Sequence, residues 1–148
     1  FALLGALRLN GFCLLEPDSP EYLFGAKSLA AFHGYRELDR PGEPLQTLRP
    51  PGLPLLLVPL TWISPYAVVG AKLIVLAIAL VAIVLVVRLG GLLAGLLVAS
   101  SPYALLHATE VVSEFPYLAC SVAAILIMTR TTDRPSRRQL DLGLVLLR

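Results

Sequence analysis

The position of the charged residues constrains this chain more than any other feature. From Leu73 to Leu106 the only charged side chain is Arg88, and Gly90 and Gly91 follow it closely. A helix that crosses the hydrocarbon core of a bilayer needs about 20 consecutive apolar residues. The stretch is therefore long enough for two such helices joined by a tight turn at 88–91. This pattern predicts an all-α membrane protein whose chemistry lies where the polar residues gather.

The composition agrees with a membrane protein. Hydrophobic residues make up 57% of the sequence and charged residues only 15%, whereas soluble domains carry roughly 25% charged residues. The net charge of +2 gives no support to nucleic-acid binding, because nucleic-acid-binding domains carry concentrated basic charge. We therefore expect membrane lipid, and no nucleic acid, among the partners.

The order of apolar and polar segments predicts a polytopic membrane helix bundle. We expect the chain to be the N-terminal part of a larger protein with further spans. The two prolines at 54 and 59 indicate a broken helix rather than a clean span. The predicted segments are the end of a first span (1–15), an outer loop (16–52), a broken interfacial helix (53–65), three spans (66–87, 92–106 and 115–129), a cytoplasmic basic loop (130–139) and the start of a further span (140–148).

The outer loop is predicted to carry a short amphipathic helix. Apolar residues recur at helical spacing from Tyr22 onward, and Gly34 is placed to end the helix as its C′ residue. Such a helix would lie on the membrane surface with its apolar side down. The rest of the loop is rich in Pro and Gly, which indicates irregular structure. Lys72, near the start of the next span, is expected to extend its ammonium group out of the membrane.

Basic residues predict the orientation of the chain. Arg130, Arg134, Arg137 and Arg138 follow the last complete span against one acid, Asp133. The positive-inside rule places this segment, and the turn at Arg88, in the cytoplasm. Residues 16–52 and 107–114 then face outward. We expect an integral protein of the bacterial plasma (inner) membrane with its active face on the periplasmic side.

Both outward segments carry carboxylates beside apolar sequence. Asp18 follows the first span, and Glu110 and Glu114 follow the third. The first outer segment also offers cationic or proton-exchanging groups, namely Lys27, His33, Arg36, Arg40 and Arg49. Cations can hold phosphate oxygens, and an acid can activate a hydroxyl or an amine. The combination suits a substrate with a phosphate head and a lipid tail.

The motifs and their order resemble those of a GT-C glycosyltransferase. The similarity rests on Asp18-Ser19-Pro20-Glu21-Tyr22, on Arg49-Pro50-Pro51-Gly52 entering the membrane, and on Ser101-Pro102 followed by Ser113-Glu114. The most similar group is that of the family 39-like bacterial enzymes, which are related to protein O-mannosyltransferases and aminoarabinose transferases. The resemblance covers nearly the whole chain, and corresponds to the N-terminal part of such an enzyme.

The resemblance implies transfer of a sugar from a polyprenyl-phosphate donor to a lipid, glycan or protein acceptor outside the membrane. Asp18 matches an essential acid, Tyr22 a tyrosine beside the donor phosphate, Arg49 a basic residue on the lipid phosphate, and Glu114 a second acid. Glu21 and His33 complete the substrate-binding candidates. Many relatives have Asp-Glu where Asp18-Ser19 stands, and Asp where Glu114 stands. A divalent metal is therefore left open, and no other cofactor is expected.

Each candidate residue also has a purely structural interpretation. Asp18 can cap a helix together with Glu21, and Arg49 can lie in a solvated turn before two prolines. Glu114 and His33 suit the start and the end of a helix, respectively, by their charge. Two other functions stay open, a multi-span transporter or permease fragment and a non-catalytic membrane scaffold. The absence of acids from the span interiors favours chemistry at the surface over transport.

Overall fold

The computed structural model describes residues 1–7, 9, 18–63 and 68–132. Every regular element in these ranges is a helix, which confirms the all-α prediction. The predictions for the rest of 1–15, for 64–67 and for 133–148 lie outside the described residues. The elements are α1 (Ala2–Leu7), α2 (Asp18–Ala30), α3 (Gly52–Ile63), α4 (Val68–Ser100), α5 (Pro102–Ala108) and α6 (Glu114–Thr132).

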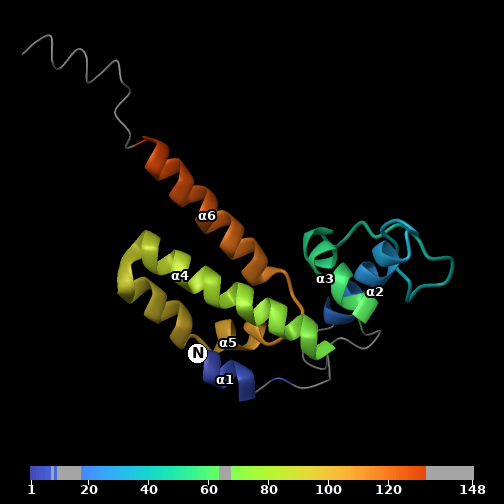
Figure 1. Cartoon of the computed structure of the whole chain (residues 1–148), viewed down its shortest axis with the longest axis horizontal. Coiled ribbons are helices and arrows are strands. Elements are labelled where there is room, and N and C mark those ends of the chain that lie inside the picture. Colours follow the sequence, from blue (N-terminus) through green and yellow to red (C-terminus); the bar gives the residue numbers. More distant parts are fainter. Residues whose placement is uncertain (8, 10–17, 64–67, 133–148) are drawn as a thin grey trace, which may run out of the picture.

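Helix α4 is a hairpin of two helical arms (Figure 1). The chain reverses at Gly91, whose φ of 81° and ψ of 176° lie in a region that is essentially restricted to glycine. The arms approach so closely that a Cβ atom on Gly95 would lie 2.1 Å from Cγ2 of Val87. The turn expected at 88–91 is therefore confirmed.

The second arm does not continue through the predicted range 92–106, so this part of the prediction is wrong. It ends at Ser100, and α5 begins at Pro102. Ser101 has an extended backbone and caps α5, because its hydroxyl accepts a hydrogen bond from the Ala104 amide at 3.4 Å. Pro102 suits the first helical position, where its missing N–H has no partner to lose.

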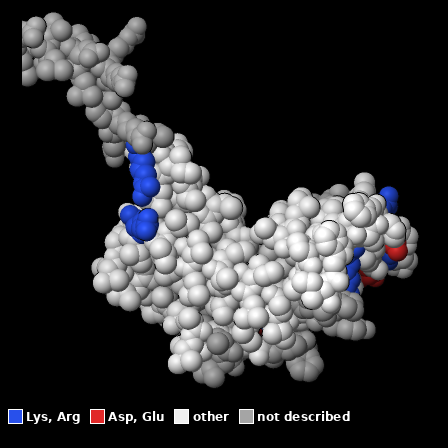
Figure 2. Space-filling model, viewed as in Figure 1, with Lys and Arg blue, Asp and Glu red and all other residues white. Residues whose placement is uncertain are grey.

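One helix of the described ranges, α4, is long and apolar enough to span a membrane. Only 22% of its most apolar window is buried, whereas the core helix of a soluble protein is mostly buried. Leu92, Leu93 and Leu97 are among its exposed side chains. This exposed apolar surface supports membrane association of α4. In Figure 2 a broad surface without charged residues separates the two groups of charged residues.

Helices α2 and α3 form a packed pair at the end of the molecule away from the α4 turn (Figure 1). Gly25 on α2 allows a close approach, because a Cβ atom there would lie 2.6 Å from the Tyr35 ring and 3.5 Å from Cγ of Pro54 on α3. The helix pair joins α4 through one apolar cluster, and α4 joins α5 and α6 through another. The first contains Tyr22, Ala26, Leu53, Leu57, Ala71, Val75 and Val111; the second contains Leu76, Ala79, Ala82, Ala108 and Phe115.

The end of α2 differs from the prediction. The amide of Phe32 donates to the Leu29 carbonyl at 3.1 Å, and the amide of His33 donates to the Ser28 carbonyl at 3.1 Å. Phe32 has a φ of 58°, so it is the left-handed C′ residue of a Schellman motif. Gly34 also has positive φ, but it lies two residues beyond this cap. The expectation that Gly34 is the C′ residue is wrong.

Two further local predictions are wrong. Helix α3 runs from Gly52 to Ile63 across both prolines. Pro54 lies in the first turn, where its missing N–H has no helical partner, whereas Pro59 lies inside the helix and removes one hydrogen bond without ending it. Lys72 does not extend toward solvent. Its side chain is fully buried, and its ammonium group is paired with Glu110.

The loop that joins α2 to α3 is well organised. An isolated antiparallel bridge joins Arg36 and Leu45, with hydrogen bonds of 2.9 Å from the Glu37 amide to the Pro44 carbonyl and from the Gln46 amide to the Tyr35 carbonyl. The bridge closes the loop and returns the chain toward α2. Arg49 thereby reaches the start of that helix.

Candidate functional site

Arg49 links the loop to the first turn of α2 through two ion pairs. Its Nη2 atom contacts Oδ1 of Asp18, and its Nε atom donates to Oε2 of Glu21 at 2.7 Å. Asp18 and Glu21 are three residues apart on a helix, so both carboxylates project from the same side. The side chains of Arg49, Asp18 and Glu21 are 28%, 30% and 23% exposed. The cluster is therefore ordered by its own contacts but remains accessible.

Arg49 retains hydrogen-bonding capacity after making these contacts. The ion pairs use Nε and Nη2, and within the described ranges Nη1 makes no hydrogen bond. A guanidinium group has five N–H donors in a planar fork. The hydrogen bond with Glu21 raises the pKa of Arg49 further above its ordinary value. The side chain is thus permanently charged and has an edge that can bind an anion.

Tyr22 lies next to this cluster and joins it to Ser113, the residue before α6. Its side chain is buried, and its hydroxyl shares a hydrogen bond of 2.8 Å with Oγ of Ser113. Burial raises the pKa of Tyr22; the hydrogen bond with Ser113 and the charge of Arg49 oppose this effect, while Glu114 and Asp18 add to it. The Tyr22 hydroxyl is therefore within electrostatic range of both acidic motifs.

The segment between α5 and α6 makes two further contacts. The amide of Val111 donates to Oγ of Ser19 at 3.2 Å. Nζ of Lys72 donates to Oε1 of Glu110 at 3.2 Å, and the two side chains are 0% and 4% exposed. Within the described ranges, Oε2 of Glu110 makes no hydrogen bond. The first part of the segment 107–114, from His107 to Val112, is therefore buried.

An apolar cavity of about 610 Å³ opens beside the cluster. Pro50, which follows Arg49 directly, lies on its wall together with Ser113 and Glu114. The rest of the lining comes from the starts of α3 and α6, namely Gly52, Leu53, Leu56, Pro116, Tyr117 and Cys120. A volume of about 300–1,000 Å³ with a few polar groups is typical of small-molecule sites.

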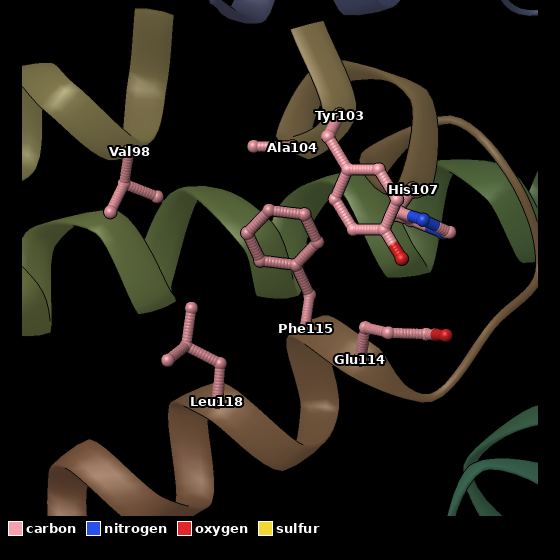
Figure 3. Close-up of a pocket in the computed structure, with 7 residues that line it drawn as sticks. All are labelled: Val98, Tyr103, Ala104, His107, Glu114, Phe115 and Leu118. Atoms are coloured by element: carbon pink, nitrogen blue, oxygen red, sulfur yellow. The ribbon is translucent and has the colours of Figure 1, made fainter. Parts of the chain in front are cut away.

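A second cavity of about 160 Å³ lies between α5 and α6. Figure 3 shows Tyr103, His107 and Glu114 on one side of the Phe115 ring, with aliphatic side chains on the other. The rings of Tyr103 and His107 pack edge to face with centroids 4.0 Å apart. Glu114 lines both cavities, so it lies between the small apolar hollow and the larger one.

The structure brings together five of the six candidate site residues. Arg49 contacts both Asp18 and Glu21, and Tyr22 is next to Glu21 in the chain. Glu114 directly follows Ser113, which is hydrogen-bonded to Tyr22. Asp18 and Arg49, which come from two separate motifs, are thus in direct contact.

His33 lies elsewhere. Its side chain is exposed and lines an open hollow with Arg36 and Glu43, and its carbonyl accepts a hydrogen bond from Arg36 Nε at 3.0 Å. His33 is therefore not part of the cluster formed by Arg49, Asp18 and Glu21.

Several contacts that hold the site together were not predicted from the sequence, although Ser19, Ser113 and Glu110 stand in or beside its motifs. Ser19 and Ser113 connect the two motifs, and Lys72 with Glu110 anchors the segment between α5 and α6. The isolated lysine at the start of an otherwise uncharged helix was the available indication, since a charge in a membrane helix calls for a partner.

The described part of the chain offers few ligands for a metal ion. Within residues 1–7, 9, 18–63 and 68–132, no group of three or more His, Cys, Asp or Glu side chains could hold a metal ion. The carboxylates of Asp18 and Glu21 are engaged by Arg49. The described residues therefore do not fit a resident metal.

Comparison of the chain with family models, with curated proteins and with solved structures finds no match.

Proposed function

We propose that the chain belongs to a membrane glycosyltransferase that moves a sugar from a polyprenyl-phosphate donor to a lipid, glycan or protein acceptor. One observation carries this proposal. The guanidinium group of Arg49 is oriented by two carboxylates, and the next residue, Pro50, lines an apolar cavity of about 610 Å³. The arrangement suits a ligand with an anionic head and a hydrophobic tail.

The donor phosphate binds the Nη1 side of Arg49, and the polyprenyl tail enters the apolar cavity. Arginine suits this task because its planar fork matches phosphate oxygens and its charge does not depend on pH. The contacts with Asp18 and Glu21 hold the guanidinium in one orientation before the donor arrives. Preorganisation of this kind reduces the entropy lost on binding.

Asp18 acts as the general base of the transfer. Its carboxylate accepts the proton of an acceptor hydroxyl or amine while the acceptor atom forms a bond to the anomeric carbon of the sugar. The bond between that carbon and the phosphate oxygen breaks, and the lipid phosphate leaves with the electron pair. Arg49 stabilises the negative charge that develops on the leaving phosphate, as a fixed cation does in a site with little water. A proton acceptor in place contributes typically 10²–10⁴-fold to the rate.

The proposal includes a polytopic topology in a bacterial plasma membrane, with the site on the periplasmic side. In this topology the first arm of α4 and α6 each cross the membrane, and the second arm of α4 together with α5 forms the return crossing between them. The distribution of charge supports this topology. Arg88 at the turn of α4 and Arg130 near the end of α6 are exposed at one end of the molecule, while the mixed charges around α2 and its loop lie at the other end (Figure 2).

A transporter is the second candidate, and one observation favours it. Buried ion pairs in membrane helices often mark ion or substrate pathways, and Lys72 with Glu110 is such a pair. The pair lies next to the Ser19–Val111 contact at the same end as Arg49, rather than midway along α4. This position fits support of a surface site better than a pathway across the membrane.

Sugar transfer by membrane vesicles tests the proposal. Vesicles that contain the protein receive an undecaprenyl-phosphate-linked hexose or aminopentose, and the sugar that reaches membrane acceptors is measured. Asp18→Asn should reduce transfer roughly 100-fold or more. Asp39→Asn, which alters an exposed acid of the same loop, should leave it unchanged. Full activity of the Asp18→Asn protein would exclude the proposed base, and solute flux without transfer would favour the transporter.

A further inference from the structure

The buried pair of Lys72 and Glu110 has no role in the proposed transfer, yet it occupies a costly position. Both side chains are almost completely buried. Removing two charges from water costs several kcal/mol per ion, so replacing a buried pair with apolar side chains is often neutral or even stabilising. Stability alone therefore does not account for the pair, and its position must be considered.

The pair fixes one side of the segment 109–113, and two hydrogen bonds fix the other. Lys72 on α4 holds Glu110. The Val111 amide then donates to the Ser19 hydroxyl, and the Ser113 hydroxyl bonds that of Tyr22. The segment thus connects the apolar helix α4 with the polar helix α2.

The two contacts on α2 are next to the residues that hold Arg49. Ser19 follows Asp18 directly, and Tyr22 follows Glu21 directly. A shift of the segment 109–113 would therefore move or rotate the first turn of α2, and with it both carboxylates. Reactive groups must be held within about 0.5 Å of the productive geometry, and an error of about 1 Å can cost roughly 100-fold in rate.

We propose that Lys72 and Glu110 are positioning residues for the Asp18–Arg49 site, acting through Ser19 and Tyr22. The inference rests on the proposed function for its catalytic consequence. The directional ion pair sets the register between α4 and the segment 109–113. That segment then sets the rotation of α2 through its two hydrogen bonds. An apolar pair of similar volume would fill the same space without setting this register.

The test compares an apolar double variant with a matched control. Lys72→Met with Glu110→Leu removes both charges together, so no uncompensated buried charge remains and the protein should fold. The control is Arg40→Met with Glu37→Leu, which removes another ion pair, of 2.8 Å, in the loop between α2 and α3. Thermal unfolding, hydrogen exchange and sugar transfer are measured for both proteins.

Thermal stability should stay close to that of the wild type in the Lys72 and Glu110 double variant. Exchange of the Val111 amide should become at least roughly tenfold faster, and kcat for sugar transfer should fall about 10–100-fold with a smaller change in the donor KM. In the control variant, the Val111 exchange rate and kcat should each stay within about twofold of the wild-type values. A Lys72 and Glu110 double variant with wild-type exchange and wild-type kcat would overturn the proposal.

The hydrogen-exchange result separates this inference from the proposed function. If the wild-type protein transfers no sugar, the proposed glycosyltransferase fails. Exchange at Val111 still reports whether the ion pair positions the segment 109–113. If the wild type transfers sugar and Val111 stays protected in the double variant, the positioning role fails alone.

Discussion

Substitution of Gly91 by Ala should weaken the hairpin of α4. The backbone at Gly91 has a φ of 81° and a ψ of 176°, a combination that is essentially restricted to glycine and costs other residues about 1–3 kcal/mol. No heavy atom outside its immediate chain neighbours lies within 4 Å of a Cβ added at this position, so the cost is conformational rather than steric. At roughly 2–4 °C per kcal/mol for a chain near this length, Tm should fall by about 2–12 °C.

Thermal unfolding followed by circular dichroism in detergent micelles measures this effect. Gly52→Ala is the matched control, because Gly52 lies at the start of α3 and a Cβ there also meets no atom within 4 Å. Alanine restricts the unfolded chain, so this change should stabilise the protein by about 0.4–1 kcal/mol. Opposite signs for the two variants support the account of the turn. A Gly91→Ala protein as stable as the wild type would refute it.

Two further predictions follow from the site. Burial raises the pKa of Tyr22 and of Tyr35 above the ordinary value of 10.0. The folded state therefore keeps these protons at a pH where the unfolded state has lost them. The free energy of unfolding has its full value below about pH 10 and decreases as the pH rises further. Tyr22→Phe should reduce this alkaline loss in thermal unfolding, and an unchanged pH dependence would contradict the assignment to Tyr22. In a Cys13→Ser protein, undecaprenyl phosphate should slow maleimide labelling of Cys120, which is exposed and lines the 610 Å³ cavity; equal labelling rates with and without the lipid would exclude that cavity as the tail site.

Features encoded by local sequence could be predicted. The turn of α4 followed from one charge and two glycines in the middle of an apolar stretch long enough for two spans, because a basic residue favours a connection at the membrane surface. The helix starting near Asp18 followed from its capping residues and spacing. The resemblance assigned Asp18 and Arg49, from two short motifs, to one site, and the structure joins them by an ion pair after the loop closed by the Arg36–Leu45 bridge.

Features that depend on distant partners could not be predicted. Lys72 was expected to extend toward water because its partner Glu110 is separated from it by 38 positions. Phe32 adopts a left-handed conformation that glycine adopts more readily, so Gly34 was the natural choice for the cap. Ser101 caps a new helix, α5, through its hydrogen bond with the Ala104 amide, whereas the stretch without charged residues continues to Leu106. These outcomes depend on tertiary contacts and on competition between neighbouring residues.

Binding of undecaprenyl phosphate to purified protein in nanodiscs tests the central claim most directly. Arg49→Gln removes the guanidinium that is oriented by Asp18 and Glu21, and a charge-assisted phosphate contact contributes about 1.5–3 kcal/mol. The account predicts a roughly 10–150-fold weaker Kd for this variant, and an unchanged Kd for Arg40→Gln, which alters a largely exposed arginine in the same loop. Equal affinity of the Arg49→Gln and wild-type proteins for the lipid phosphate would contradict the account.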